Sequence, residues 1–381
     1  MTGFDASWLL LIIPAAFALG WLASRLDIRQ GKRDPRDAAA PYFKGLNLLL
    51  NEQQDKAIDA FIEAVQLDPD TVELHFALGN LFRRRGETER AVRVHEHLLQ
   101  RGDLPESERH RAQHALAQDF FKAGLFDRAE AAYLALKGSA YELDAELALL
   151  SLYERSRDWA HAAEVAAQLE QRGAGSFAPR RAHFLVEQAL LARDAGHADE
   201  ARALIDKAKH IAPAHPRAYV QDGRWKLEAG QHEAALQCFE VLANLRLSTF
   251  LLVADDYALA ALGAGQAPAA LARLKERYAE EPALSLLTSM KLLDPGGHAE
   301  RLLAHLRLHP SLNAASGLLQ PLLAAHALEV SAPLQRAVDA AAKPLLRHRC
   351  AACGFEALHY FWQCPGCLSW DSFPPRPVEE L

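Results

Sequence analysis

Apolar residues recur at spacings of three and four along most of the chain, from about residue 38 to about residue 342. This spacing predicts a long series of amphipathic helices. A first set of landmarks comprises Gly45, Ala57, Phe61, Ala64 and Pro69. A second set, shifted by 34 residues, comprises Gly79, Ala91, His95, Leu98 and Asp103. Small and aromatic residues at a period of about 34 are typical of tetratricopeptide helical hairpins.

Five further units continue the series with the same small, aromatic and proline positions. Their landmarks are Gly124, Ala129, Tyr133; Trp159, Ala162, Ala166; Gly196, Ala201, Ile205, Ala208, Pro213; Gly223, Gly230, Ala235, Phe239; and Gly265, Ala270, Leu274, Pro282. Small residues let the two helices of a hairpin approach, the aromatic is expected to fill the gap to the next hairpin, and proline ends the second helix. Because one hairpin cannot bury its own apolar face, the hairpins must stack. We predict an all-α tetratricopeptide-repeat solenoid of about seven to nine hairpins over residues 38–342, rather than an unrelated helical bundle.

The N-terminal residues 8–23 are apolar and uncharged, and with the residues before them they reach about 20, enough to cross a bilayer as a helix. No lysine or arginine precedes them. Five basic residues follow: Arg25, Arg29, Lys32, Arg33 and Arg36. By the positive-inside rule we predict a single-pass transmembrane anchor at residues 1–25, a basic linker at 26–37 and a cytoplasmic location for the rest. The alternative, a cleaved signal peptide, lacks the positive charge that normally begins one.

The formal net charge is -7, with 24% charged and 50% hydrophobic residues, which fits a globular protein and does not suggest nucleic-acid binding. A stacked array has a concave surface, which we expect to hold a protein segment of acidic character. This groove is predicted to contain Asn80, Arg83, Arg84, Phe121, Lys122, Arg193 and Arg224. The alternative is an ordinary solvated polar face.

Four of the five cysteines form two C-x-x-C pairs near the C-terminus: Cys350, Cys353, Cys364 and Cys367. Thiolates at this spacing enclose one tetrahedral metal ion, so we predict a rubredoxin-like or zinc-ribbon domain at residues 347–375. The ion is zinc or iron, because both accept four thiolates in this geometry. We favour a structural metal over a redox centre, since Leu368 stands where redox rubredoxins commonly have glycine.

The residues around the cysteines give further expectations. Residues 357–363 are predicted to form a strand between the two pairs. His348 and His359 flank the site but are not expected to be ligands. Trp370 and Phe373 are expected to pack on the repeats or on a partner, because so short a domain cannot build its own core.

No catalytic constellation is evident in the sequence. His95 and His97 lack the i, i+4 spacing of a zinc protease helix, and no phosphate-binding GxxxxGK[ST] is present. The 17 histidines are scattered and are interpreted as helix surface or packing residues. We therefore expect a scaffold and not an enzyme.

The whole layout resembles one bacterial family, lipopolysaccharide assembly protein B, also called LapB or YciM. The resemblance rests on residues 51–61 (NEQQDKAIDAF), 71–95 (TVELHFALGNLFRRRGETERAVRVH) and 120–133 (FFKAGLFDRAEAAY), together with the anchor and the rubredoxin-like end. It covers essentially the full chain. The fading of the repeats after Pro282 and the presence of Leu368 are its departures from the family pattern.

This resemblance implies an inner-membrane protein that faces the cytoplasm and lacks catalytic activity. It implies an adaptor for the membrane AAA+ protease FtsH that promotes degradation of the deacetylase LpxC and so restrains lipopolysaccharide synthesis. Other inner-membrane regulators of lipopolysaccharide synthesis are further expected partners. Two alternatives are a rubredoxin-type redox protein and a general envelope-assembly scaffold without a protease link.

Overall fold

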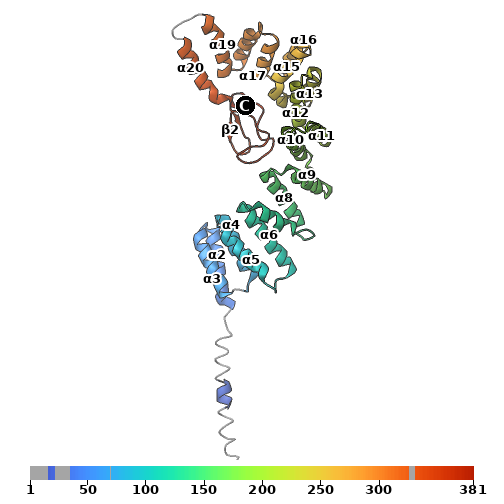
Figure 1. Ribbon diagram of the computed structural model, residues 1–381. Coiled ribbons are helices and arrows are strands. Elements are labelled where there is room, and N and C mark those ends of the chain that lie inside the picture. Colours follow the sequence, from blue (N-terminus) through green and yellow to red (C-terminus); the bar gives the residue numbers. More distant parts are fainter. Residues whose placement is uncertain (1–15, 22–34, 69, 326–330) are drawn as a thin grey trace, which may run out of the picture. The chain divides into compact units, whose positions relative to one another are not determined.

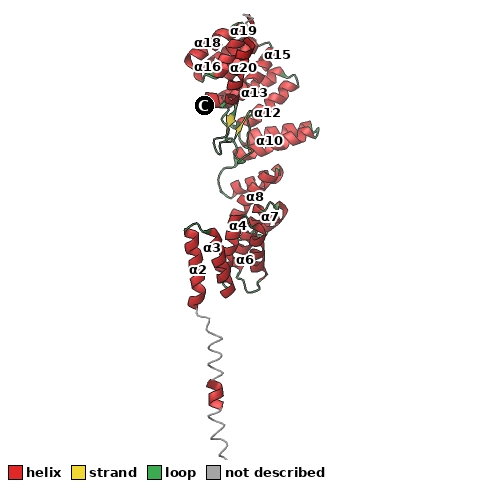
Figure 2. Cartoon of the chain, turned by 90° about the vertical axis from the view of Figure 1, so that its left-hand side faces the viewer, coloured by secondary structure: helices red, strands yellow, loops and turns green. Residues whose placement is uncertain are grey.

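The computed structural model describes residues 16–21, 35–68, 70–325 and 331–381 of the chain, and most of these residues are helical (Figure 1). They divide into two compact units, one ending at Leu152 and one beginning at Tyr153. Among the described residues, the two named strands are residue pairs near the C-terminus (Figure 2). The prediction of a helical tetratricopeptide-repeat protein with a small, non-helical C-terminal domain around the four cysteines (residues 347–375, the knuckle) is confirmed.

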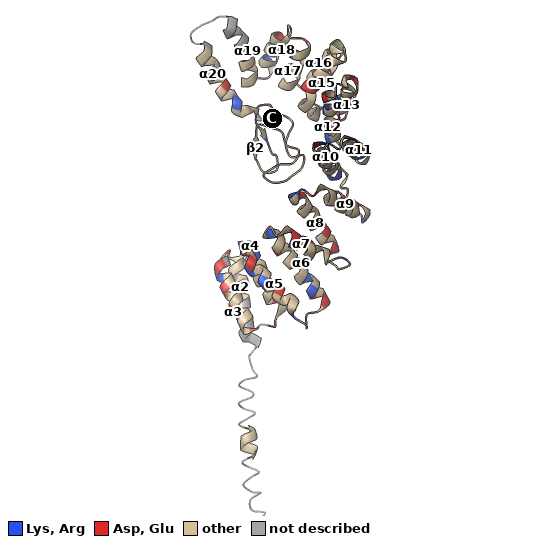
Figure 3. Cartoon of the chain, in the orientation of Figure 1, with Lys and Arg blue, Asp and Glu red and all other residues tan. Residues whose placement is uncertain are grey.

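The first unit consists of consecutive helices joined by short loops. Its helices are α2 (Pro35–Leu50), α3 (Gln54–Leu67), α4 (Val72–Arg85), α5 (Thr88–Gln100), α6 (Glu106–Lys122), α7 (Phe126–Leu134) and most of α8 (Glu142–Ser156). From α2 to α7, each helix packs on its neighbour in sequence, as expected for stacked hairpins. Basic and acidic residues are interspersed along these helices (Figure 3).

The second unit continues the hairpins and adds the knuckle. Its helices are the end of α8, α9 (Trp159–Gln171), α10 (Ala178–Asp194), α11 (Ala198–Ile211), α12 (Pro216–Glu228), α13 (His232–Leu245), α14 (Leu247–Phe250), η2 (Leu251–Val253), α15 (Ala254–Gly263), α16 (Ala267–Glu280), α17 (Leu284–Leu293), α18 (His298–Leu308), α19 (Leu312–Ala325) and α20 (Ser331–Ala342). The remaining elements are η3 (Lys343–Leu346), β1 (His348–Arg349), β2 (Glu356–Ala357) and η4 (Val378–Glu380). The helical pairing therefore continues past Pro282, where the sequence pattern fades.

The predicted anchor at residues 1–25 lies mostly outside the described residues. Within it, residues 16–21 are helical and exposed. Across the described part of the chain, no helix combines the length and the apolar character that a membrane crossing requires. The anchor therefore stays a prediction from the sequence.

In three hairpins, a glycine of the first helix packs against a phenylalanine or histidine ring of the second helix. A Cβ atom added to Gly223 would lie 2.4 Å from Phe239, and one added to Gly45 would lie 2.7 Å from Phe61. Gly79 faces the ring of His95 in the same way. The aromatic landmark thus packs against its own hairpin, and Phe61 and Phe239 also belong to cores shared with the following helices, as expected. Close approach of the two helices explains why glycine stands at these positions.

The C-terminal tail fixes the end of the chain to the last repeats. The Glu379 carboxylate accepts hydrogen bonds from the backbone amides of Leu312 (2.5 Å) and Asn313 (3.3 Å) at the start of α19. Glu380 Oε1 accepts one from the amide of Leu284 at the start of α17, at 3.0 Å. Carboxylates suit these positions because helix N-termini leave amide donors unpaired and carry partial positive charge.

Candidate metal centre and its docking on the repeats

The four C-terminal cysteines converge on one point. Their sulfur atoms all lie within 4.8 Å of one another. Cys350 Sγ is 3.8 Å from Cys367 Sγ, and Cys353 Sγ is 3.7 Å from Cys364 Sγ. A tetrahedral ion with metal–sulfur bonds of about 2.3 Å requires sulfur atoms about 3.8 Å apart. The donor set therefore fits a single zinc or iron ion.

The two cysteine pairs are held by matching turns. The amides of Gly354 and Leu368 donate to the carbonyls of Cys350 and Cys364, at 2.9 and 2.8 Å. Both residues have left-handed backbones, with φ of 77° at Gly354 and 60° at Leu368. Leu368 thus adopts the conformation that glycine provides in the first turn, and its presence does not change the turn geometry.

The thiols favour different ionisation states. Burial raises the pKa of Cys350, but hydrogen bonds with Ser372 and with the amides of Cys353 and Ala352 outweigh it and bring the pKa to about 6. The amide of Phe355 lowers the pKa of Cys353, but burial and the neighbouring thiols raise it to about 12. Four thiolates this close repel one another, so full ionisation needs a cation among them.

The secondary structure around the cysteines differs in part from the prediction. Of the expected strand over residues 357–363, only Ala357 is paired in β2 with β1, and Gln363 forms an isolated bridge with Trp370. The residues between them form bends and loop, so the continuous strand over 357–363 is wrong. Phe373 packs inside the knuckle with Cys350 and Cys364. It therefore completes the knuckle's own small core and does not dock on the repeats.

Histidines near the cysteines lie outside the donor cluster. His348 Nδ1 is 3.2 Å from the Pro374 carbonyl oxygen, and His359 is exposed. Cys238, the fifth cysteine, is buried on α13, with its sulfur 3.2 Å from Asp222 Oδ2 and from Lys226 Nζ.

Known protein families match both the cysteine domain and the repeats. Residues 348–375 match the family model of the rubredoxin metal binding domain, and residues 45–93 match the model of the TPR repeat. Lipopolysaccharide assembly protein B of Escherichia coli (strain K12) is 30% identical over 378 residues, covering 96% of this chain and 97% of that protein. The chain belongs to the lipopolysaccharide assembly protein B family.

A second member of the lipopolysaccharide assembly protein B family shows similar coverage. The protein of Haemophilus influenzae (strain ATCC 51907 / DSM 11121 / KW20 / Rd) is 27% identical over 409 residues, covering 98% of each chain. Among solved structures, a tetratricopeptide repeat protein from Parabacteroides merdae is 15% identical with a TM-score of 0.34. It covers 68% of this chain and 99% of its own, and a score this low adds nothing to the assignment.

In this family member, aromatic side chains dock the knuckle on the repeats. Trp370 stacks on His183 of α10, with ring centroids 4.3 Å apart, and meets Trp159 edge-on at 6.0 Å. Its Nε1 donates to Glu154 Oε1 of α8 at 3.2 Å. Trp362 packs against the apolar core built from α12 to α19. The expectation that Trp370 packs on the repeats is confirmed.

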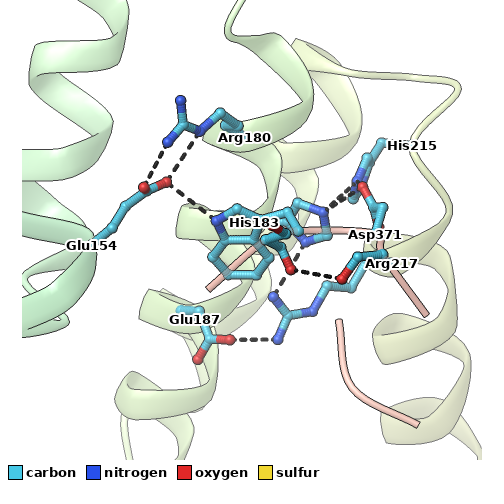
Figure 4. Close-up of polar contacts among 10 residues, drawn as sticks. Glu154, Arg180, His183, Glu187, His215, Arg217 and Asp371 are labelled. Carbon is cyan, nitrogen blue, oxygen red and sulfur yellow. Dashed lines mark hydrogen bonds and ion pairs between the residues drawn. The ribbon is translucent and has the colours of Figure 1, made fainter. Parts of the chain in front are cut away.

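A polar network surrounds this docking surface (Figure 4). Asp371 lies 2.9 Å from His183 Nε2, and the Nε2 atoms of His183 and His215 are 3.1 Å apart. Arg217 donates to Glu187 Oε1 at 2.6 Å and lies 3.3 Å from His183 Nδ1. Sequence reasoning treated these histidines as scattered. Their separation of 32 residues, close to one repeat, was the only available signal that they share a face.

Most of the predicted groove arginines join neighbouring hairpins. Arg83 binds Asp119, which is fully buried, at 2.8 Å and also donates to Asn80. Arg193 binds Glu228 at 2.5 Å, and Arg224 donates to Asp256 at 2.8 Å. The partners of these arginines lie 32 to 36 residues along the chain, which is one repeat away.

The other predicted groove residues differ in exposure. Arg84 and Lys122 are exposed, and Phe121 is half-buried beside Phe126. The predicted groove residues are divided between the two units. The first contains Asn80, Arg83, Arg84, Phe121 and Lys122, and the second contains Arg193 and Arg224. Binding of a partner by these residues stays a prediction, because the inter-repeat ion pairs alone account for three of the arginines.

Proposed function

We propose that this chain is an inner-membrane adaptor that restrains lipopolysaccharide synthesis by promoting degradation of LpxC by the protease FtsH. Residues 1–25 anchor it, residues 26–37 form a basic linker, and the repeats face the cytoplasm. The adaptor has no catalytic activity of its own. It brings the deacetylase, or another regulator of lipopolysaccharide synthesis, to the membrane protease.

The observation that carries this proposal is the full-length similarity to curated proteins named lipopolysaccharide assembly protein B. The structure adds support of a different kind. Stacked helical hairpins offer extended surfaces for protein segments, which suits an adaptor. The cysteine centre is small and docked by aromatic contacts, which suits a metal that folds and positions a domain.

The test replaces the host's own family member with this chain in a Gram-negative bacterium and follows LpxC decay after synthesis is blocked. We expect the full chain to restore rapid decay that depends on FtsH. A chain lacking residues 1–25 should leave LpxC stable although it folds, because it no longer shares the membrane with the protease. Equal LpxC decay with the truncated chain would refute the anchored-adaptor mechanism.

Crosslinking in intact membranes, followed by purification of the full chain, tests the partners directly. Recovery of FtsH and LpxC is the expected result. Recovery of other envelope-assembly proteins without FtsH would favour a general scaffold instead.

A further inference from the structure

A second group of metal-binding side chains lies where the knuckle meets the repeats. His183 belongs to α10, His215 is the residue just before α12, and Asp371 follows the second cysteine pair. Figure 4 shows the two rings and the carboxylate meeting at one place. Two histidines and a carboxylate are a common donor set for zinc in proteins.

The distances among these donors match one coordination sphere. His183 Nε2 is 2.9 Å from Asp371 Oδ2 and 3.1 Å from His215 Nε2. His215 Nε2 is 3.8 Å from the same carboxylate oxygen. Metal–nitrogen and metal–oxygen bonds of about 2.0 to 2.1 Å in a tetrahedron place ligand atoms about 3.3 Å apart. The three separations bracket that value.

Two of the donors, His183 and Asp371, have the charge states that metal binding requires. Burial lowers the pKa of His183 to about 4, so its ring is neutral at physiological pH. Burial opposes ionisation of Asp371, but the hydrogen bond with His183 and the nearby ring of His215 lower its pKa below the usual range. A neutral imidazole and an ionised carboxylate are the protonation states that ligation requires.

Hydrogen bonds alone do not satisfy the cluster. If His183 Nε2 donates to Asp371, the Nε2 atom of His215 faces an N–H that is already used. A cation between the two Nε2 atoms and the carboxylate would be bound by all three lone pairs.

The surrounding charges allow a divalent cation. Arg217 is the nearest positive group, and its Nη2 donates to Glu187 Oε1 at 2.6 Å, which balances its charge. Asp371 remains as a negative charge of the cluster. A metal on His183 Nε2 places the ring proton on Nδ1, so the 3.3 Å contact with Arg217 Nη1 gives way while the Glu187 pair remains. The Asp371 side chain is 38% exposed, which leaves a path for the ion and for a water as fourth ligand.

We propose that His183, His215 and Asp371 form a second metal site, for a divalent transition ion such as Zn²⁺, that links the knuckle to the repeats. Two ligands come from the repeats and one from the knuckle, so binding at this site strengthens docking. The site does not share ligands with the four cysteines, and the proposal is independent of the adaptor function.

Cobalt binding to the full chain tests the site. The chain is purified in detergent, stripped of metal under reducing conditions and titrated with Co²⁺ alone. We expect about two ions per chain. One gives the intense sulfur-to-cobalt charge-transfer bands of a thiolate site, and the other gives only the weaker visible bands of nitrogen and oxygen ligands. Binding of about one ion at saturation would overturn the proposal.

Variants assign the second ion. His215→Gln and Asp371→Asn should each lower binding to about one ion while leaving the sulfur-to-cobalt bands unchanged, which also shows that the knuckle is folded. His210→Gln is the control, because His210 is an exposed histidine on α11 outside the cluster. An equal loss in the His210 variant would show adventitious surface binding and would refute the assignment. A cluster variant that also loses the charge-transfer bands has a disrupted knuckle. In that case the number of Co²⁺ ions bound by the unaltered chain decides whether the second site exists.

Discussion

Trp370 lies against His183 with its ring plane 22° from parallel and the ring centroids 4.3 Å apart. The same indole donates its N–H to Glu154. One side chain of the knuckle therefore contacts residues of α8, α9 and α10.

Substituting Trp370→Ala should release the knuckle from the repeats. Loss of a large packed ring typically costs about 3 kcal/mol, which corresponds to about a 100-fold increase in the undocked population. Limited proteolysis of the segment between Ala342 and His348 should accelerate accordingly. Trp225→Ala is the control, since Trp225 packs on Arg193 within the repeats. Unchanged cleavage in the Trp370 variant would contradict this docking role.

Substituting Cys364→Ser should remove metal from the four-cysteine centre and unfold the knuckle. Cys364 is fully buried, and metal binding provides most of the folding free energy of so small a domain. Sulfur-to-cobalt bands and the melting profile report the two effects. Cys238→Ser, at a buried cysteine on α13, should keep the bands. A Cys364 variant that retained both the bands and the melting temperature would disprove the ligand assignment.

Substituting Gly223→Ala should destabilise the sixth hairpin. The added methyl group would lie 2.4 Å from the Phe239 ring, and such overpacking costs about 1–3 kcal/mol. The urea midpoint should fall, and the second change Phe239→Leu should recover part of the loss by making room. Gly102→Ala has open space around the new methyl group and should change stability by less than about 0.5 kcal/mol. Equal midpoints for the two alanine variants would refute the close-approach explanation.

Substituting Leu368→Gly should stabilise the second cysteine turn. A left-handed backbone costs a non-glycine residue about 1 kcal/mol, so relief of that cost should slow metal release to a chelator by about fivefold. Leu358→Gly serves as the control, because Leu358 is exposed and lies outside the left-handed region. Faster release from the Leu368 variant would show that its side chain matters more than its backbone.

In the chain whose four-cysteine centre holds its metal and whose His183–His215–Asp371 site is empty, acidification should weaken docking through His183. Burial depresses its folded pKa to about 4 from an ordinary value of 6.5, so the undocked form binds more protons between these values. The stabilisation is complete above pH 6.5 and falls as the pH decreases toward 4, by about 2 kcal/mol between pH 7 and pH 5. Asp371 stays ionised over this range because its pKa is depressed as well. Proteolysis between Ala342 and His348, the segment before β1, should therefore accelerate at pH 5.

A His183→Gln chain provides the comparison for this pH effect. Proteolysis of this chain between Ala342 and His348 should depend less on pH than that of the unaltered chain, because the buried titrating ring is gone. An identical pH dependence in both chains would assign the effect to other groups.

The sequence by itself determined the features that depend on local spacing. The period of about 34 residues predicted the hairpins because each one is built from contacts within and between adjacent units. The two C-x-x-C pairs predicted the metal centre because all four ligands lie within 18 residues, and short turns bring them together. The role of Gly79 and Gly223 followed from the same periodicity.

Only the tertiary structure decided the features that join distant parts of the chain. His183 and Asp371 are 188 residues apart, so no local pattern indicates that they meet. The sequence alone predicted that the groove arginines contact a bound protein segment. Stacking places an acid from the next repeat beside Arg83, Arg193 and Arg224. Phe373 and Trp370 are both aromatic and close in sequence, yet one fills the knuckle's core and the other docks it. Backbone turns around the cysteines direct these two rings to opposite roles, and residue type alone carries no information about that direction.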